Sequence, residues 1–195
     1  MKKTITTLLG ASVMTSSLYA GMCSDKLNYD FTFYGAADKS YVVTKNTFKT
    51  STSNFPGEKL LNSTLSIDAF SIDTSADMSN GKGKWPASMA TLRNNNTINN
   101  FFKKFDKDAG KIDVKIVKIG ADSMDLEFKM NGMTKVIPFS YKENAGMIEA
   151  TGKLDVLAFG TDTAWQRFAS ICKGFHKGKS WSEIDVNFTV PSSCK

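Results

Sequence analysis

The fold of this chain is limited most strongly by an alternation of apolar and charged residues from Met124 to Met130, which reads Met-Asp-Leu-Glu-Phe-Lys-Met. The apolar residues occupy one parity and the charges the other, and Ile184 to Val190 repeats the pattern. Successive side chains of a strand point to opposite faces, so both segments predict antiparallel sheet with one face in water. The functional question is what the apolar face covers: a packed core, a lipid bilayer or a cavity for an apolar ligand.

Eight segments are predicted as strands and two as helices. The strands are 28–35, 41–48, 61–72, 111–119, 123–130, 134–141, 147–158 and 182–190, and the helices are 87–105 and 161–174. Asn131-Gly132 is a strong hairpin signal, whereas Asn94-Asn-Asn96 lowers helix propensity and predicts that the first helix is two short pieces. Eight antiparallel strands favour a mainly β fold, a single closed barrel able to hold one small ligand.

An outer-membrane barrel alternates in the same way and is the main rival. Three features count against it. Charges such as Asp125, Glu127 and Lys129 fill the outer parity, two helical segments interrupt the strands, and no aromatic girdles are evident. We therefore expect a barrel in water with an apolar interior.

The N-terminus has the three-part plan of a secretory signal peptide. Lys2 and Lys3 precede a short apolar run from Ile5 to Val13, and Ala20 is a small residue at the expected cleavage point. Cleavage there leaves residues 21–195 as one exported domain. Met22 stands where a lipobox requires a small residue before Cys23, which argues against lipidation. No later stretch approaches the roughly 20 apolar residues of a membrane helix.

Three cysteines remain after export, at positions 23, 172 and 194. Cys23 precedes the first strand and Cys194 follows the last, so antiparallel pairing of those strands would bring them together. We expect a Cys23–Cys194 disulfide and a free Cys172 on a helix. A catalytic Cys172–His176 pair is the alternative, but no third orienting residue is visible nearby.

Other chemistries find little support in the sequence. The net charge of +6 includes the two leader lysines, and the remaining lysines are scattered, so we do not expect nucleic-acid binding. His176, the one histidine, lacks partners at metal-ligand spacing. We expect it to brace the turn from helix to strand. No Gly-x-Ser-x-Gly elbow or phosphate-cradling glycine loop occurs. We therefore predict no enzyme, no metal and no cofactor.

The sequence resembles the YceI-like family in several short motifs. They are Leu65 to Thr74, Leu92-Arg-Asn94 with Phe101-Phe102, the hairpin from Met130 to Val136, and the segment from Cys172 to Trp181. The resemblance extends from about Cys23 to Val190. It implies an extended lipocalin-like barrel, in the periplasm and possibly dimeric, whose pocket takes a polyisoprenoid or another long-chain lipid. Asn94 replaces the Asp usual in the family, and residues 77–87 look like extra sequence.

Two functions are predicted from these observations. The first is a periplasmic carrier or reservoir for an apolar lipid such as a polyisoprenoid or isoprenoid quinone, and the second is a stress-response or interaction protein with a filled core. For the first, strand parity predicts a lining of Phe31, Phe33, Leu65, Ile67, Leu126, Phe128, Ile137, Phe139, Val186 and Phe188. Arg93, with Lys177 and Lys179, would meet a polar head group at the mouth.

Overall fold

The computed structural model describes residues 22–79 and 83–195. The expected signal peptide lies outside this range. The strands are β1 (Asn28–Gly35), β2 (Tyr41–Phe48), β3 (Ser51–Asn54), β4 (Thr64–Asp68), β5 (Ile72–Asp73), β6 (Lys111–Ile119), β7 (Ser123–Met130), β8 (Met133–Asn144), β9 (Met147–Asp155) and β10 (Glu183–Pro191). The α-helices are α1 (Met22–Asp25), α2 (Ser88–Asn100) and α3 (Asp162–Cys172). Five short 3-10 segments complete these elements: Pro56–Glu58, Ala69–Ser71, Phe102–Lys104, Val156–Phe159 and Ser192–Cys194.

All ten strands belong to one antiparallel sheet, in the order β3-β4-β6-β7-β8-β9-β10-β1-β2-β5. The expected count of eight is therefore wrong, and the reason is local. The predicted strand 61–72 is divided by a 3-10 turn over Ala69–Ser71, and the strand at 41–48 resumes as β3 after a break at residues 49–50. The fold is a barrel-like curled sheet with few helices.

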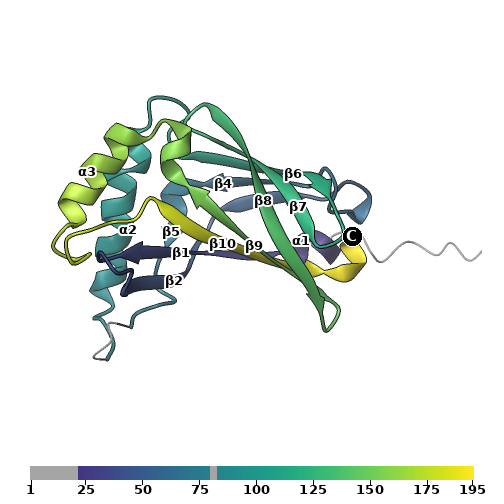
Figure 1. The fold of residues 1–195 in the computed structure, drawn as a ribbon, viewed down its shortest axis with the longest axis horizontal. Helices are drawn as coiled ribbons and strands as arrows, with labels where there is room; N and C mark the ends of the chain where they lie inside the picture. The colour runs from purple at the N-terminus through teal and green to yellow at the C-terminus, as the bar shows by residue number, and fades with distance from the viewer. Residues whose placement is uncertain (1–21, 80–82) are drawn as a thin grey trace, which may run out of the picture.

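The strand pairs at the two ends of this order, β3-β4 and β2-β5, come from the same two stretches of chain. β2 pairs with β5, β3 pairs with β4, and between them Lys49 N donates to Ser71 O at 3.0 Å and Asp68 N donates to Thr50 O at 3.0 Å. Residues 41–54 therefore run beside residues 64–73, and the sheet curls around one interior (Figure 1).

The hairpin between β7 and β8 follows directly from its sequence. Met130 pairs with Met133, which leaves Asn131 and Gly132 as a two-residue loop, both with positive φ (52° and 71°). Such a loop matches the right-handed twist of the strands and favours Asn-Gly. Asn131 also donates from Nδ2 to the carbonyls of Phe159 and Gly160, at 3.0 and 3.1 Å. The predicted hairpin is confirmed, and it ties β8 to the segment before α3.

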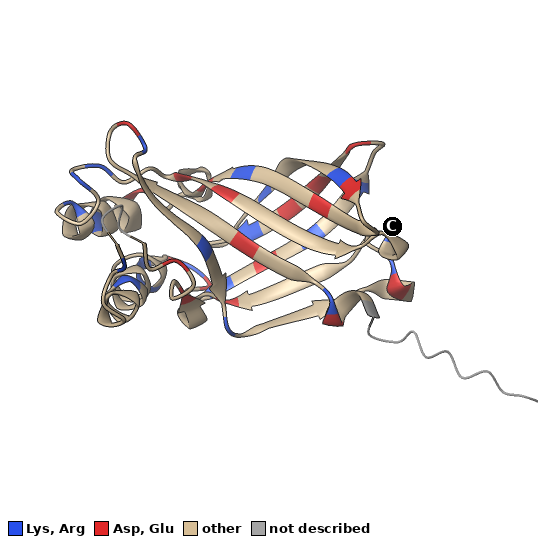
Figure 2. Ribbon diagram, turned by 90° about the horizontal axis from the view of Figure 1, so that it is seen from below, with Lys and Arg blue, Asp and Glu red and all other residues tan. Residues whose placement is uncertain are grey.

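Charged residues are distributed along the strands of the sheet (Figure 2), and on β7 they alternate with buried apolar residues and so take the more exposed face. Many face an opposite charge on the next strand: Lys153 Nζ lies 2.7 Å from Asp185 Oδ1, and Lys142 Nζ lies 2.9 Å from Glu149 Oε2. Such exposed pairs add little stability each, but they keep this face hydrated. Within residues 22–79 and 83–195, no helix has the length and apolar character needed to cross a membrane.

The two ends of the barrel-like sheet are closed in different ways (Figure 1). At one end the disulfide Cys23–Cys194 joins α1 to the C-terminal segment, which confirms the predicted pairing. Cys172, the last residue of α3, is free and buried, as expected. This end is filled by side chains with at most 1% of their surface exposed: Leu60, Met124, Phe139, Ile148 and Val190. At the other end α2 and α3 pack together over the opening.

The predicted helix 87–105 is two pieces, α2 and the 3-10 turn Phe102–Lys104, but the break falls at Phe101 and not at Asn94 to Asn96, where α2 is continuous. A tertiary contact overrides the weak local propensity. Asn94 Oδ1 accepts hydrogen bonds from Thr74 N at 3.1 Å and from Thr74 Oγ1 at 2.9 Å, which fixes the helix to the strand end after β5.

Candidate ligand-binding site

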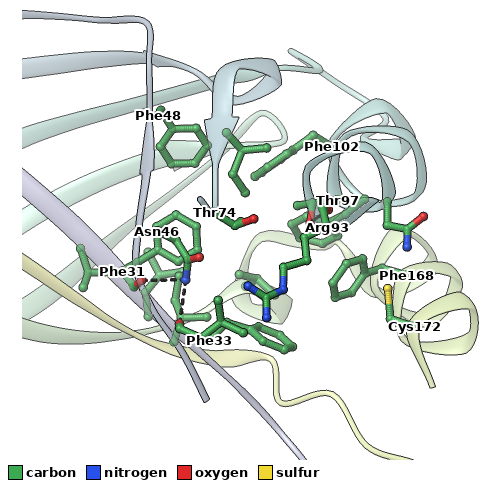
Figure 3. A pocket seen from close by; sticks show the side chains of 18 of the residues that line it. Phe31, Phe33, Asn46, Phe48, Thr74, Arg93, Thr97, Phe102, Phe168 and Cys172 are labelled. Atoms are coloured by element: carbon green, nitrogen blue, oxygen red, sulfur yellow. Dashed lines mark hydrogen bonds between the residues drawn. The ribbon is translucent and has the colours of Figure 1, made fainter. Parts of the chain in front are cut away.

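A cavity of about 160 Å³ lies inside the sheet beneath α2 and α3. Its wall is almost wholly apolar, with side chains from eight strands (β1, β2, β4, β5, β6, β7, β9 and β10), from α2 and α3 and from the segments that join them. Phe31, Phe33, Phe48, Phe102 and Phe168 are among the aromatic lining residues (Figure 3), and the wall also includes Phe101, Phe128, Met130, Trp165 and Val186. Apolar cavities of roughly this size, about 150 Å³, stay dry and admit small apolar molecules. The geometry therefore suits an apolar ligand or part of a longer one.

The covering helices are held by aromatic contacts. The ring centroid of Phe101, at the end of α2, lies 5.9 Å from that of Trp165 and 6.1 Å from that of Phe168 on α3. Phe168 in turn lies 6.0 Å from Phe33 on β1, edge to face. Aromatic pairs with this spacing stabilise by about 0.5–1.5 kcal/mol each beyond their buried area. The cover is thus apolar on the side that faces the cavity.

The sequence-predicted lining residues divide between the two ends of the interior. Phe31, Phe33, Ile67, Phe128, Val186 and Arg93 line the cavity. Leu126, Phe139 and Phe188 lie in the packed core, while Ile137 packs against that core and Leu65 is half-buried. Strand parity identifies the inward face correctly but carries no information on position along the strand, and the cavity occupies only the helical end.

Within β7 the division falls between Leu126 and Phe128. Met124 and Leu126 are enclosed by side chains, whereas Phe128 and Met130 border the cavity. The ring of Phe128 stacks on that of Phe139 with centroids 6.1 Å apart. Phe128 therefore forms the boundary between solid core and open space.

Several polar groups interrupt the apolar wall. Arg93 on α2 donates from Nη1 to the carbonyl of Asp77 at 2.7 Å and so ties the helix to the segment before it. Asp77 accepts hydrogen bonds from Thr44 and Ser79. Burial raises the pKa of the Asp77 carboxyl, but the hydrogen bonds from Ser79 and Thr44 outweigh this and hold it well below its usual range. Asp77 thus helps to position a residue of the cavity wall.

His176 is a buried loop histidine, 7% exposed, at the turn between α3 and β10. Its Nδ1 is 2.6 Å from Ser180 Oγ, its carbonyl accepts from Ala36 N at 2.8 Å, and its ring lies 4.8 Å from that of Phe33. The predicted bracing role is confirmed. Burial lowers the pKa of His176 to about 4, and the nearby charge of Arg93 acts in the same direction.

The alternative of a Cys172–His176 catalytic pair finds no support in the geometry. Burial raises the pKa of the Cys172 thiol to about 11, the opposite of what a thiolate nucleophile requires. The imidazole makes its hydrogen bond with Ser180 instead. Of the three cations proposed for a head group, only Arg93 lines the cavity; Lys179 Nζ lies 3.5 Å from the centroid of the Trp181 ring.

Sequence reasoning missed Asn46 and Thr74, the buried polar residues of the cavity wall besides His176. Asn46 is inward because β2 gains a residue opposite β1: Phe33 pairs with Val43, but Phe31 pairs with Asn46. Lys45 adopts a positive φ of 55° at this bulge. A bulge re-aims the next side chain and breaks the alternation, so parity could not find Asn46.

Comparison with known proteins bears on the fold. No family model and no curated protein matches the sequence. Among solved structures, a polyisoprenoid-binding domain from Saccharophagus degradans, implicated in plant cell wall breakdown, superposes with a TM-score of 0.54 at 11% identity, over 84% of this chain and 91% of that domain. The chain therefore shares the fold of that domain. The sequence resemblance is thus confirmed at the level of the fold.

Two further structures are similar at lower scores. Burkholderia cenocepacia BcnA gives a TM-score of 0.48 at 15% identity, covering 83% of this chain and 94% of BcnA. A mutant CJ YceI protein with a monobromobimane guest gives 0.42 at 17% identity, covering 75% and 81% of the two chains.

Proposed function

We propose that this protein is a YceI-like lipid-binding protein that holds a long-chain apolar lipid, of isoprenoid type, in the cavity beneath α2 and α3. It acts as a carrier or reservoir rather than as an enzyme. The observation that carries the proposal is the cavity itself, a space beneath the two helices walled by aromatic and aliphatic side chains, within a fold shared with a polyisoprenoid-binding domain. Affinity would come from buried apolar area, roughly 25 cal/mol per Å².

The periplasm is the proposed site of action. The disulfide between Cys23 and Cys194 suits an oxidising compartment, and the N-terminal leader pattern suits export. The competing function, a filled barrel acting through its surface, fits the disulfide end alone. An open apolar cavity at the other end favours the carrier.

A matched pair of variants tests the proposal. Val186→Trp places a large side chain where Val186 lines the cavity, whereas Val136→Trp makes the same change at a side chain that is 53% exposed. Farnesol, an isoprenoid probe, should bind the unmodified protein and V136W in isothermal titration calorimetry, and V186W should lose binding. Native mass spectrometry of the purified protein should show a co-purifying apolar lipid. Absence of that lipid together with no farnesol binding to the unmodified protein would refute the proposal.

A further inference from the structure

Asn46 turns its side chain toward the cavity with one hydrogen-bonding group unused. Its Nδ2 donates to the carbonyls of Phe31 at 2.9 Å and Val43 at 2.8 Å, which closes the bulge. Because two carbonyls face the nitrogen, the amide cannot be exchanged end for end. Among the described residues no donor pairs with Oδ1, although Asn46 is only 1% exposed. A buried acceptor of this kind requires a partner.

Arg93 presents the complementary group from the other side. Its Nη1 donates a hydrogen bond to the carbonyl of Asp77, while its Nε is buried and has no hydrogen-bond partner within the described chain. Figure 3 shows the Arg93 side chain extending from α2 into the pocket and Asn46 entering it from the strand side. An unpaired acceptor and an unpaired donor therefore face one apolar cavity.

The neighbouring polar groups do not complete this pair. Thr74 Oγ1 donates to Asn94 Oδ1 at 2.9 Å, and His176 Nδ1 is engaged with Ser180 Oγ. A ligand atom that satisfies both Asn46 and Arg93 has to donate one hydrogen bond and accept another. A hydroxyl group does both. A quinone carbonyl or an ionised phosphate only accepts, and an ammonium group would meet the positive charge of Arg93.

We propose that the cavity selects lipids whose chain ends in a hydroxyl group, with the hydroxyl donating to Asn46 Oδ1 and accepting from Arg93 Nε. This inference rests on the proposed lipid-binding function and specifies the head group of its ligand. Because the site's polar groups are left unpaired by a ligand that lacks the hydroxyl, discrimination should be strong.

The test uses three probes that share one isoprenoid chain: farnesol, farnesyl methyl ether and the hydrocarbon farnesene. Dissociation constants are measured by isothermal titration calorimetry on the full mature chain. We expect farnesol to bind at least about tenfold more tightly than the ether, since only the alcohol donates to Asn46. The ether should bind more tightly than farnesene, since its oxygen accepts from Arg93. A purely steric effect of the methyl group would instead place the ether below the hydrocarbon.

The variant Arg93→Met separates the two contacts. It should remove the difference between ether and hydrocarbon and leave the preference for alcohol over ether. Arg167→Met, a matched change on the exposed side of α3 where Arg167 contacts Asn100, should leave all three affinities unchanged.

Equal binding of alcohol, ether and hydrocarbon to the unmodified protein would overturn the hydroxyl site and leave the lipid-binding proposal standing, because water then satisfies Asn46. If none of the three probes binds, the lipid-binding proposal fails as well.

Discussion

His176 shows how the covered end of the molecule controls the charge of a single residue. Its pKa is about 4 in the folded protein against 6.5 ordinarily, so the unfolded chain takes up the proton first as the pH falls. We expect full stabilisation above pH 6.5, progressive loss between pH 6.5 and 4, and no further loss from this group below that. The total is roughly 3 kcal/mol, at about 1.4 kcal/mol per pH unit. Urea unfolding across this range should show the slope, and it should flatten in His176→Phe.

Phe128 and Phe139 stack on each other yet should respond differently to truncation. Phe139 is 1% exposed within solid core, and Phe128 borders the cavity. Phe139→Ala should lower the free energy of unfolding by about 3–5 kcal/mol. Phe128→Ala should cost clearly less, because one side of that ring already lacks neighbours, and it should change farnesol affinity. Denaturant titrations measure the difference, and equal losses would mean that Phe128 stands in solid core.

At the scale of elements, β8 and β9 are fitted to each other through one glycine. Gly152 pairs with Phe139, and a Cβ at position 152 would lie 2.5 Å from two ring carbons of Phe139. Gly152→Ala should therefore destabilise by about 1–3 kcal/mol through overpacking. The loss should be partly recovered in combination with Phe139→Leu, which a double-mutant cycle quantifies. Gly174→Ala is the control and should change stability little, because a Cβ added at Gly174 would have no atom within 4 Å apart from those of the adjacent residues.

The elements also show how far the sequence pattern could predict the fold. Alternation located β7 over Ser123–Met130 with the correct bounds, because buried and more exposed side chains alternate along it. It also gave the correct bounds of β6, Lys111–Ile119, but not the register shift between Ile116 and Lys118 in its pairing with β7. It could not place the break at residues 49–50 or the turn at Ala69–Ser71, since these depend on how two distant segments pair around the curl.

The site was harder to predict than the fold. Parity placed Phe31 and Phe33 in the cavity wall, and Arg93 was proposed as a cation at the barrel mouth; all three line the cavity. Asn46 was missed because its direction depends on the bulge at Lys45, which has no local sequence signal. Phe139 was assigned to the lining because parity does not report which end of the barrel-like sheet the helices leave open.

For the whole molecule, the Cys23–Cys194 disulfide joins residues 171 positions apart. A cross-link closing so long a loop should stabilise by about 5 kcal/mol on the chain-entropy model, and typical losses on removal are about 2–5 kcal/mol. The double change Cys23→Ser with Cys194→Ser should lower the urea midpoint accordingly. Farnesol affinity, measured where the variant is still folded, should be unchanged because the cavity lies at the opposite end (Figure 1). A large loss of affinity would show that the two ends are coupled.

The two ends of the sheet are closed in different ways, and this difference bears on how a ligand could reach the cavity. The disulfide end is closed by a covalent bond and filled with side chains. At the helical end, aromatic contacts and hydrogen bonds hold α2 and α3 in place, and neither helix is hydrogen-bonded into the sheet as a strand. Local opening needs least free energy where no ladder bonds break. If the protein binds a lipid as proposed, we expect the lipid to enter and leave through the helical end, so that binding and release follow the same path in opposite directions.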